Sequence, residues 1–441
     1  DAAALYCQTS DWERLSALVM THAQALLMQG RAMALEGWIK CFPEEVLEDS
    51  PWLIFWLGTS KTPFNPPEAS IHLERAFNLF DAQKNPAGVF LSWSGVVESI
   101  ILYYHDLSLV DTWIERLDKL LKKYPAYPSP EIEARVTCWM FNALYHRQPH
   151  HRDTRLWLDR AMSLTDKSTN TDFIISSLGY ISIYFAFVGD FKMMSLLTER
   201  VKELALSGSA SDMWRITAIF AESLNSTWRT PENSLAAVNK GLALSRSSGV
   251  NIWTTHLLIN GASASFIKGD LSAGGKFLKE TASVMERARR ADTSQYQLLI
   301  AWYGLLRGRI PEAMAHVQKA LDLAVAMGAP FAEAHGHYGL AQALHERGEH
   351  RKAAHHLKMF RGVGGKGKEY EYLLAAAQFG LDRGRETEGL KLLRGAMAIG
   401  SENDYGAFWF WQPDVMARLC TKALAEGIEV EYVKGLIRRF N

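Results

Sequence analysis

The stretch EAMAHVQKALDLAVAM, residues 312–327, decides the fold class of this chain. Its small and aliphatic residues recur every three or four positions, at Ala313, Val317, Ala320 and Ala324. This spacing places them on one face of a helix. The same periodicity continues through almost the whole chain, and no stretch shows the sustained alternation of a half-buried strand. The sequence therefore predicts an all-α protein.

A short turn, made of Gly and a polar residue, separates the predicted helices at a regular interval. The turns lie at 189–190, 269–270, 308–309, 348–349 and 384–385. The later turns are roughly forty residues apart, a period typical of helical repeat proteins. The first gap is about twice as long and contains WRTPE (228–232), where Pro231 suits the first turn of a helix. We therefore expect about ten antiparallel helix pairs, with a turn near residue 229.

Small residues recur at one position after these turns, where two helices of a pair would cross. Ala313 and Ala353 hold this position in two repeats, and Gly274 and Gly389 hold it in two others. A single pair cannot bury its apolar stripe, so each pair must stack on its neighbours. The pattern resembles the tetratricopeptide repeat, although its usual unit is about 34 residues. That resemblance implies a right-handed superhelical solenoid in which the first helix of each pair lines a concave surface.

Two stretches resemble a more specific family. EGWIKCFPEEVLEDSPWLIFWLG (36–58) resembles the start of the helical domain in MalT-type regulators, which are ATP-dependent transcription activators of the STAND class. The residues that carry this resemblance are Trp38, Ile39, Phe42, Pro43, Leu47, Pro51, Trp52 and Leu53. DYGAFWFWQPDVMARLCTKALAEGIEVEYVKGLIRRF (404–440) looks like the end of the same domain. We therefore expect a repeat array over 1–403 and terminal capping helices over 404–441, which lead to a further C-terminal domain.

The resemblance also implies a function. In such regulators the helical array receives an inducer or a partner protein and controls an NTPase domain, and a DNA-binding domain follows the array. Neither of these two domains is in this chain, so the array would be a non-catalytic sensor that acts within a larger regulator. The alternative is a plain protein–protein interaction scaffold of the tetratricopeptide type, without a small-molecule switch.

The composition narrows the possible partners. Hydrophobic residues make up 48% and charged residues 22% of the chain, enough to bury a core. Lys and Arg total 48 and so do Asp and Glu, which gives a formal net charge of zero. Nucleic-acid binding usually needs a basic excess to contact phosphates. We therefore expect no direct binding of nucleic acid and no binding to an anionic membrane.

The cysteines and the longest apolar stretch point to the cytoplasm. Cys7, Cys41, Cys138 and Cys420 are far apart and form no C-x-x-C motif, so we expect neither a disulfide framework nor a zinc site. FIISSLGYISIYFAFVG (173–189) contains Ser and Gly and is too short and polar to cross a bilayer. A reduced cytoplasmic compartment fits both observations.

RGVGGKGKEY (361–370) resembles a phosphate-binding loop, with Gly362, Gly367 and Lys368 in the G-x-x-x-x-G-K spacing. Glu369 stands where a magnesium-binding hydroxyl belongs, and the preceding residues 350–362 predict a helix in place of the required strand. We interpret the stretch as a mobile loop between repeats, in which glycines end the helix and lysines stay solvated. No other catalytic or dinucleotide motif is present, so we expect no enzyme activity and no cofactor.

The histidines and a run of aromatic residues raise two further questions. His335, His337, His345, His350, His355 and His356 fall within one repeat. The pairs 335/337 and 355/356 lack the helical spacing of a metal site, so we expect solvated or locally hydrogen-bonded rings and no metal. FWFW (408–411) cannot direct all four side chains to one core if it is helical. At least one ring should be exposed, cover the end of the array or touch another domain.

Counting back from each turn glycine gives the candidate binding groove. In tetratricopeptide-like repeats, positions 2 and 9 of the first helix point into the concave surface. Together with a neighbouring aromatic residue, these positions give Ser223, His256, Ser263, Gln295, Trp302, His335, Tyr338, Gln342, Glu371 and Gln378. Polar groups on otherwise apolar helices must be solvated or bonded. They form either the wet face of the helices or a groove for an inducer or regulatory protein, with Trp302 and Tyr338 as apolar anchors.

Overall fold

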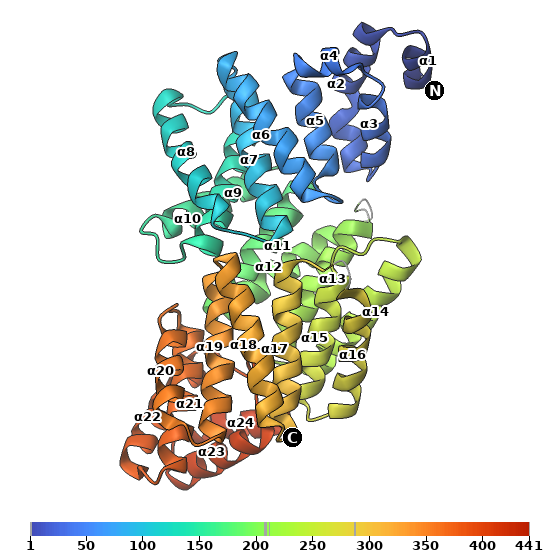
Figure 1. Cartoon of the computed structure of the whole chain (residues 1–441). Helices are drawn as coiled ribbons and strands as arrows, with labels where there is room; N and C mark the ends of the chain where they lie inside the picture. Colours follow the sequence, from blue (N-terminus) through green and yellow to red (C-terminus); the bar gives the residue numbers. More distant parts are fainter. Residues whose placement is uncertain (1, 207–209, 211, 286–287, 441) are drawn as a thin grey trace. The chain divides into compact units, whose positions relative to one another are not determined.

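The all-α prediction is confirmed by the structure, a computed structural model that describes residues 2–206, 210, 212–285 and 288–440. Within these residues the chain forms 24 helices and no strand (Figure 1). The helices form two compact units, Asp1–Ile174 and Ile175–Asn441. This division has no counterpart in the sequence pattern, which runs through the boundary inside one helix. The separation of a repeat array from capping helices at residue 403 stays a prediction.

The N-terminal unit, Asp1–Ile174, contains ten helices and the start of an eleventh. They are α1 (Ala2–Gln8), α2 (Trp12–Met28), α3 (Ala32–Ile39), α4 (Glu44–Glu48), α5 (Pro51–Lys61), α6 (Pro66–Ala82), α7 (Pro86–Tyr103), α8 (Leu109–Lys123), α9 (Pro130–Arg147), α10 (Thr154–Lys167) and α11 (Thr171–Val188). Several of these helices begin with an N-cap residue followed by proline. Asn65 caps α6 and Asn85 caps α7 by accepting a backbone N–H.

The C-terminal unit, Ile175–Asn441, contains most of α11 and the remaining helices. These are α12 (Phe191–Leu206), α13 (Asp212–Thr227), α14 (Pro231–Ser248), α15 (Thr254–Ile267), α16 (Leu271–Val284), α17 (Arg290–Leu306), α18 (Ile310–Met327), α19 (Pro330–Glu346), α20 (His350–Arg361), α21 (Lys366–Asp382), α22 (Glu386–Asn403), α23 (Pro413–Ala425) and α24 (Val430–Phe440).

The predicted turns are confirmed by the helix boundaries. WRTPE lies between α13 and α14, with Pro231 as the first residue of α14. Turn glycines such as Gly308 and Gly348 have φ values of 69° and 80°. This left-handed conformation ends a helix at little cost only when no Cβ is present.

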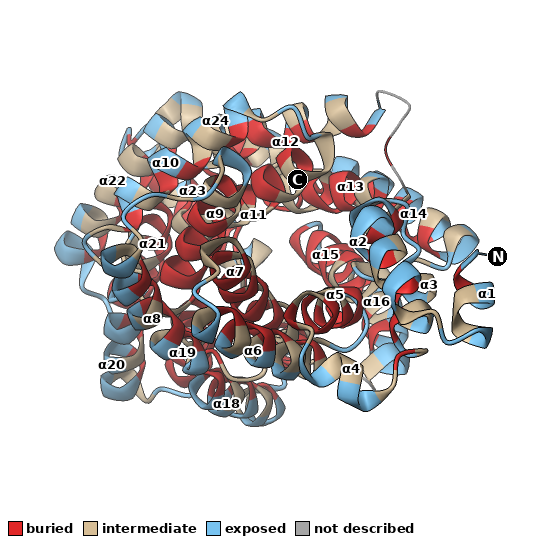
Figure 2. Ribbon diagram, turned by 90° about the horizontal axis from the view of Figure 1, so that it is seen from above, coloured by how far each residue is buried: buried red, intermediate tan, exposed pale blue. Residues whose placement is uncertain are grey.

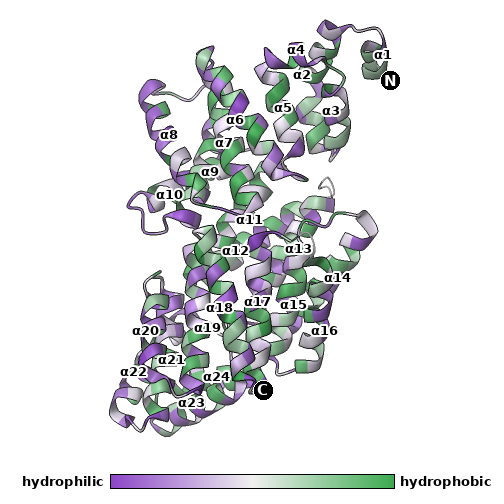
Figure 3. Ribbon diagram, viewed as in Figure 1, coloured by the Kyte–Doolittle hydropathy of each residue, from purple (hydrophilic) through white to green (hydrophobic). Residues whose placement is uncertain are grey.

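The two helices of each pair differ in burial. In α15 nearly every residue is buried, whereas α16 buries only Gly274, Leu278 and Thr281. Figure 2 shows the same contrast between buried helices such as α7 and α15 and outer helices such as α18 and α20. Figure 3 shows hydrophilic residues concentrated on α8 and α20. The first helix of a pair therefore forms the inner layer, as the repeat pattern predicts.

Two helices, α7 and α11, are long and apolar enough to cross a membrane by length and composition alone. The prediction that 173–189 is too short and too polar to cross a membrane was therefore wrong, because α11 is long enough and apolar enough by these two measures. Core helices of repeat proteins meet them too, since the inner helix of a pair is covered on most sides. Two thirds of α7 is buried inside the structure, and 44% of α11 is.

A disulfide joins Cys7 and Cys41, which corrects the prediction that the cysteines form no such bond. The two residues are 34 positions apart, but their Cα atoms are only 5.7 Å apart, because α1 folds back beside the end of α3. Sequence spacing does not reveal this proximity. Cys138 and Cys420 are free and buried.

Candidate binding groove of the C-terminal unit

Residues 404–412, which we call the inner segment, connect α22 to α23 without helical structure. Tyr405, Gly406, Ala407, Phe408, Phe410 and Trp411 are all buried, and Trp409 is half-buried. The FWFW run is therefore not on a helix. An irregular backbone can turn successive side chains toward different walls, so the argument against burying all four rings does not apply. Phe410, at a φ of 62°, shows such a change of direction.

The main chain of the inner segment is hydrogen-bonded to the turn after α13 and to the inner helix α17. The N–H of Ala407 donates to the carbonyl oxygen of Trp228 at 2.8 Å. The indole Nε1 of Trp302 donates to the carbonyl oxygen of Trp411 at 2.8 Å. Gly406 lies so close to the carbonyl of Trp228 that a Cβ would clash with it. Hydrogen bonds to the backbone of a non-helical segment are also used by proteins that bind polypeptides in a groove.

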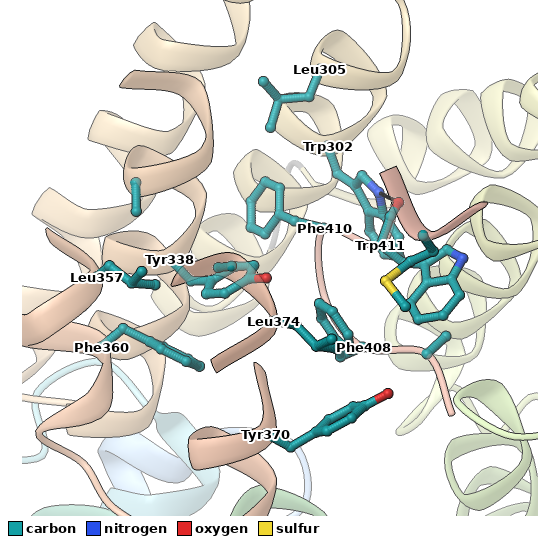
Figure 4. Packing of buried hydrophobic residues seen from close by; sticks show 14 of the residues in the cluster. Trp302, Leu305, Tyr338, Leu357, Phe360, Tyr370, Leu374, Phe408, Phe410 and Trp411 are labelled. Carbon is teal, nitrogen blue, oxygen red and sulfur yellow. Dashed lines mark hydrogen bonds between the residues drawn. The ribbon is translucent and has the colours of Figure 1, made fainter. Parts of the chain in front are cut away.

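The rings of the inner segment fill the space between the helices. Figure 4 shows Phe408, Phe410 and Trp411 among the side chains of Trp302, Tyr338 and neighbouring residues. The ring of Phe408 lies 6.0 Å from the ring of Tyr338, and the ring of Phe410 lies 6.3 Å from it. Tilted and edge-on rings at these distances add stabilisation beyond their buried area.

Trp409 and Gln412 extend these contacts. The ring of Trp409 lies 5.9 Å from those of Trp228 and Trp302. The amide of Gln412 donates to the Gln342 side chain at 3.4 Å. Gly339 is needed beside the segment, because a Cβ there would lie 2.5 Å from Phe410.

Three of the predicted groove residues, Trp302, Tyr338 and Gln342, do converge on one place. They are 0%, 1% and 3% exposed, because the inner segment covers them. Gln342 also donates to the hydroxyl of Tyr338 at 3.2 Å. The structure therefore places these residues in the interior of the unit, against the inner segment. Their binding of an external ligand stays a prediction.

His335 and Glu371 form a second group with Lys368, which is also buried. The Lys368 Nζ lies 3.1 Å from His335 Nε2 and 3.1 Å from a Glu371 oxygen. Burial and the charge of Lys368 hold the pKa of His335 well below its usual value, so this ring is neutral and accepts from the ammonium. Burial raises the pKa of Glu371, against the influence of Lys368. A buried ion pair needs such partners to offset its desolvation.

This arrangement corrects the interpretation of the glycine-rich stretch. Lys368 lies inside α21 and does not keep a loop solvated. A Cβ added to Gly367 would lie 2.8 Å from the Cα of Gly189, in the turn between α11 and α12. Gly365 has a φ of 96° and lies against Val188. The glycines therefore permit a close approach of two distant backbones.

The other predicted groove residues are separate from these two groups. Ser223 is buried and accepts from Asn260, whereas Ser263 Oγ and Gln378 Nε2 are buried without a hydrogen-bond partner among the described residues. His256 is half-buried, 3.8 Å from Asp292, and burial lowers its pKa to about 4. Gln295 is half-buried. The positions taken from the repeat resemblance are thus buried or half-buried, but they did not show which residues meet.

The histidines of the repeat at 335–356 also meet across helices. His337 Nδ1 lies 2.9 Å from His356 Nδ1, and His345 Nε2 lies 3.0 Å from a carboxylate oxygen of Asp382. In the described part of the chain, no three His, Cys, Asp or Glu residues are arranged to hold a metal ion.

The inner segment and Trp228 are the functional candidates that the repeat pattern missed. Both lie outside the helical phase, so counting from turn glycines cannot find them. The only signal in the sequence is the density of aromatic residues in DYGAFWFW, which predicts contact with another surface. That surface is the inner face of the same unit.

Comparison with known proteins supports the fold. No family model and no curated protein match the sequence. A solved Rap protein complexed with Competence and Sporulation Factor is 11% identical, with a TM-score of 0.59 over 81% of this chain and 99% of that chain. At this identity the likeness shows the fold alone.

Two further structures match less well. Aspartyl phosphate phosphatase F from Bacillus subtilis is 10% identical, with a TM-score of 0.48 over 80% of this chain and 94% of that chain. Human IFIT1 bound to m7Gppp-AAAA is 14% identical, with a TM-score of 0.44 over 90% of each chain. The arrangement of helices in this chain is that of a tetratricopeptide-like α-solenoid.

Proposed function

We propose that this chain is a polypeptide-binding helical-repeat module, and that the inner segment is the resident occupant of its binding groove. The observation that supports this proposal most strongly is the segment itself, whose main chain is hydrogen-bonded to Trp228, Trp302 and Tyr432 and whose rings lie among other aromatic rings. A groove that accommodates one irregular aromatic segment has the chemistry to accept a similar one from a partner. The Rap structure, which contains a bound factor, supports the choice of this fold for such a task.

We propose a partner segment that carries aromatic residues next to a small residue. The walls of the groove are aromatic at Trp228, Trp302 and Tyr338, and the close contact at Gly406 leaves no room for a side chain. Such a partner would compete with the inner segment and free α23 and α24, which follow it. The concave surface would then change between a closed and an open state by competition for one site.

The finer regulatory role also remains a proposal. Two observations support this role. Residues 36–58 and 404–440 resemble MalT-type regulators, and the inner segment lies immediately before α23 and α24. In that role the array would pass an inducer or partner signal to NTPase and DNA-binding domains outside this chain. We propose in addition that the chain is not an enzyme and needs no cofactor. We also propose that it acts in the cytoplasm, although a disulfide such as Cys7–Cys41 is rare in that compartment.

The test uses a labelled DYGAFWFWQ peptide and the full chain with Phe408 and Phe410 both replaced by Ser. The substitutions remove two buried rings and should empty the groove. We expect the peptide to bind this variant at least tenfold more tightly than it binds the wild-type chain, as measured by fluorescence anisotropy. A peptide with the same two serines is the matched control and should not bind.

A second variant guards against misfolding. Trp409→Ala removes a half-buried ring and should disturb the fold less. Circular dichroism checks that each variant remains helical. Equal or absent peptide binding to folded variants and wild type would rule out the groove as a polypeptide site. Binding of a second copy of the chain in place of the peptide would appear as a dimer in light scattering and would also contradict it.

A further inference from the structure

A pocket of about 310 Å³ opens beside the first residue of the inner segment. Six residues line it: Asn225, Ser226, Arg229, Thr230, Asp404 and Arg439. They come from the end of α13, the turn before α14, the start of the inner segment and the end of α24. Its volume is at the lower end of the range for small-molecule sites and corresponds to about ten water molecules of liquid. A single carboxylate therefore occupies only part of it.

The lining is rich in hydrogen-bond donors and carries positive charge. Arg229 and Arg439 contribute two guanidinium groups, and Asp404 is the only carboxylate among the lining residues. Arg439 Nη2 donates to Asp404 at 2.7 Å, and Arg229 donates to the other oxygen of the same carboxylate. Arg439 Nη1 is buried and has no hydrogen-bond partner in the described part of the chain. Paired guanidinium groups match the geometry of phosphate and carboxylate groups.

Neighbouring side chains hold this arrangement in position. Arg229 also lies 3.4 Å from the hydroxyl of Ser195, which donates to Asn225 at 3.1 Å. Burial would raise the pKa of Asp404, but hydrogen bonds from Arg439 and Arg229 outweigh it and keep the pKa below its usual value. The carboxylate is therefore charged at neutral pH, and it serves as an anion supplied by the chain itself. The arginine side chains are 28% and 26% exposed, so an external anion can reach them.

Asp404 has an uncommon backbone conformation, and its carboxylate is the group that an external anion would displace from the arginines. It caps the C-terminus of α22 with a φ of 51°, in the left-handed region that non-glycine residues seldom occupy. The two arginines are what hold its side chain in the pocket. An anion that bound both arginines more tightly would leave Asp404 without its partners.

Each arginine is adjacent in sequence to a ring that holds the inner segment. Arg229 follows Trp228, whose carbonyl accepts from Ala407. Arg439 precedes Phe440, whose ring lies 5.0 Å from that of Trp411. A shift in the backbone of either arginine would therefore also shift the neighbouring residue, Trp228 or Phe440, which contacts the inner segment.

We propose that this pocket binds a small metabolite bearing a phosphate or carboxylate group, which replaces the Asp404 carboxylate between Arg229 and Arg439 and loosens the inner segment. The binding itself is independent of the proposed polypeptide function. The loosening of the inner segment is also independent of it, and only the consequence for a bound partner segment rests on that function.

The experiment titrates the full chain with inorganic phosphate in one arm and succinate in the other, at constant ionic strength, by isothermal calorimetry. We expect one of the two probes to bind the wild-type chain, which identifies the preferred group. Arg439→Gln should weaken that binding at least tenfold. Arg438→Gln is the matched control, because Arg438 is exposed and bonds to the Lys434 carbonyl outside the pocket. It should leave the affinity unchanged.

Asp404→Asn gives a prediction of opposite sign. It removes the competing charge and keeps the size of the side chain, so affinity for the probe should rise at least tenfold. An unchanged or lower affinity would overturn the proposal, as would equal binding by Arg439→Gln and Arg438→Gln. Because Asp404→Asn gains affinity, a misfolded variant cannot imitate the expected result.

Hydrogen exchange measured by mass spectrometry separates binding from coupling. At a saturating probe concentration, amides of residues 404–412 should exchange at least fivefold faster than in the free chain. Binding without faster exchange would overturn the coupling and leave the anion site standing. Faster exchange in a chain that fails the peptide test would overturn the polypeptide function and leave this regulation standing.

Discussion

The two units of this chain solve the same packing problem in different ways. In the N-terminal unit the described hydrogen bonds join residues at most 42 positions apart, as between Arg116 and Glu74. In the C-terminal unit they join residues 175 and 210 positions apart, as between Arg229 and Asp404 or Lys192 and Glu402. The first unit is a chain of neighbour contacts, and the second closes on itself around its inner segment. Closure makes the stability of distant repeats interdependent, which a plain solenoid lacks.

Each unit also has its own cross-link between distant residues, which we call a tie: a disulfide in one unit and a buried aromatic cluster in the other. The N-terminal unit is joined by the Cys7–Cys41 disulfide near its start. The C-terminal unit is joined by Phe408, Phe410 and Trp411, which contact helices from several repeats. A covalent tie stabilises mainly through the unfolded chain, whereas an apolar tie stabilises the folded state. The comparison therefore predicts different responses to the same kinds of change.

The largest expected effect follows from Phe410→Ala. Removing a fully buried phenylalanine costs about 3–5 kcal/mol of unfolding free energy. In this unit the loss of stability should reach distant helices, so that amide hydrogen exchange becomes faster in both α13 and α21. Phe90→Ala is the matched control in the N-terminal unit, where Phe90 is equally buried beside Tyr127 at 5.0 Å. Hydrogen exchange should then rise only in α6 to α9, and equal spreading in both variants would remove the distinction.

Cys41→Ser tests the covalent tie. Opening a loop of this length should lower the stability of the N-terminal unit by about 3–4 kcal/mol. Denaturant unfolding followed by hydrogen exchange measures each unit separately. A reducing agent added to the wild-type chain should reproduce the effect, and residues 175–441 should be unaffected. A loss of stability in the C-terminal unit would show that the units are not independent.

The pH dependence of stability tests one buried histidine in each unit. Burial lowers the pKa of His146 and that of His256 to about 4, from 6.5 in an unfolded chain. Above pH 6.5 both rings are neutral in both states, and stability is highest. Between pH 6.5 and 4 only the unfolded chain takes up the protons, so stability falls, and below pH 4 no further loss follows.

The contribution of these two histidines to the pH dependence should differ in size. His146 is 8% exposed and should contribute on the order of 2–3 kcal/mol. The His256 side chain is 18% exposed and lies 3.8 Å from Asp292, so its contribution should be smaller. Denaturant unfolding of His146→Gln at several pH values should show a shallower slope. The control His22→Gln, at an exposed position, should keep the wild-type slope.

The smallest effect compares two tryptophans. Trp93 Nε1 donates to the Trp113 carbonyl at 2.7 Å and spans 20 residues, whereas Trp302 Nε1 donates to the Trp411 carbonyl at 2.8 Å and spans 109. Replacing either by Phe keeps an aromatic ring but loses the N–H donor and leaves a small cavity, and the lost hydrogen bond alone accounts for about 1–2 kcal/mol of the cost. Trp302→Phe should also raise exchange in residues 404–412. If it leaves that segment unchanged, the indole bond does not hold the inner segment.

Much of the helical architecture could be predicted from the sequence. Turn glycines such as Gly308 and Gly348, and Pro231 at a helix start, are local signals that act within a few residues. The candidate groove positions came from the resemblance to tetratricopeptide repeats, and they stay a prediction. The disulfide and the position of Lys368 could not be predicted, because each depends on which distant segments meet.

By itself, the sequence determined that the chain is helical and where its turns lie, whereas the inward position of the first helix of each pair was implied by the resemblance to tetratricopeptide repeats. The first two of these properties follow from backbone preferences and side-chain spacing over one or two turns of helix. Only the tertiary structure decided that Trp302 and Tyr338 face a segment of their own chain, and that Arg229 and Arg439 share Asp404. Small rotations between successive repeats accumulate over many helices, and this sum sets whether a solenoid stays open or closes on its own residues.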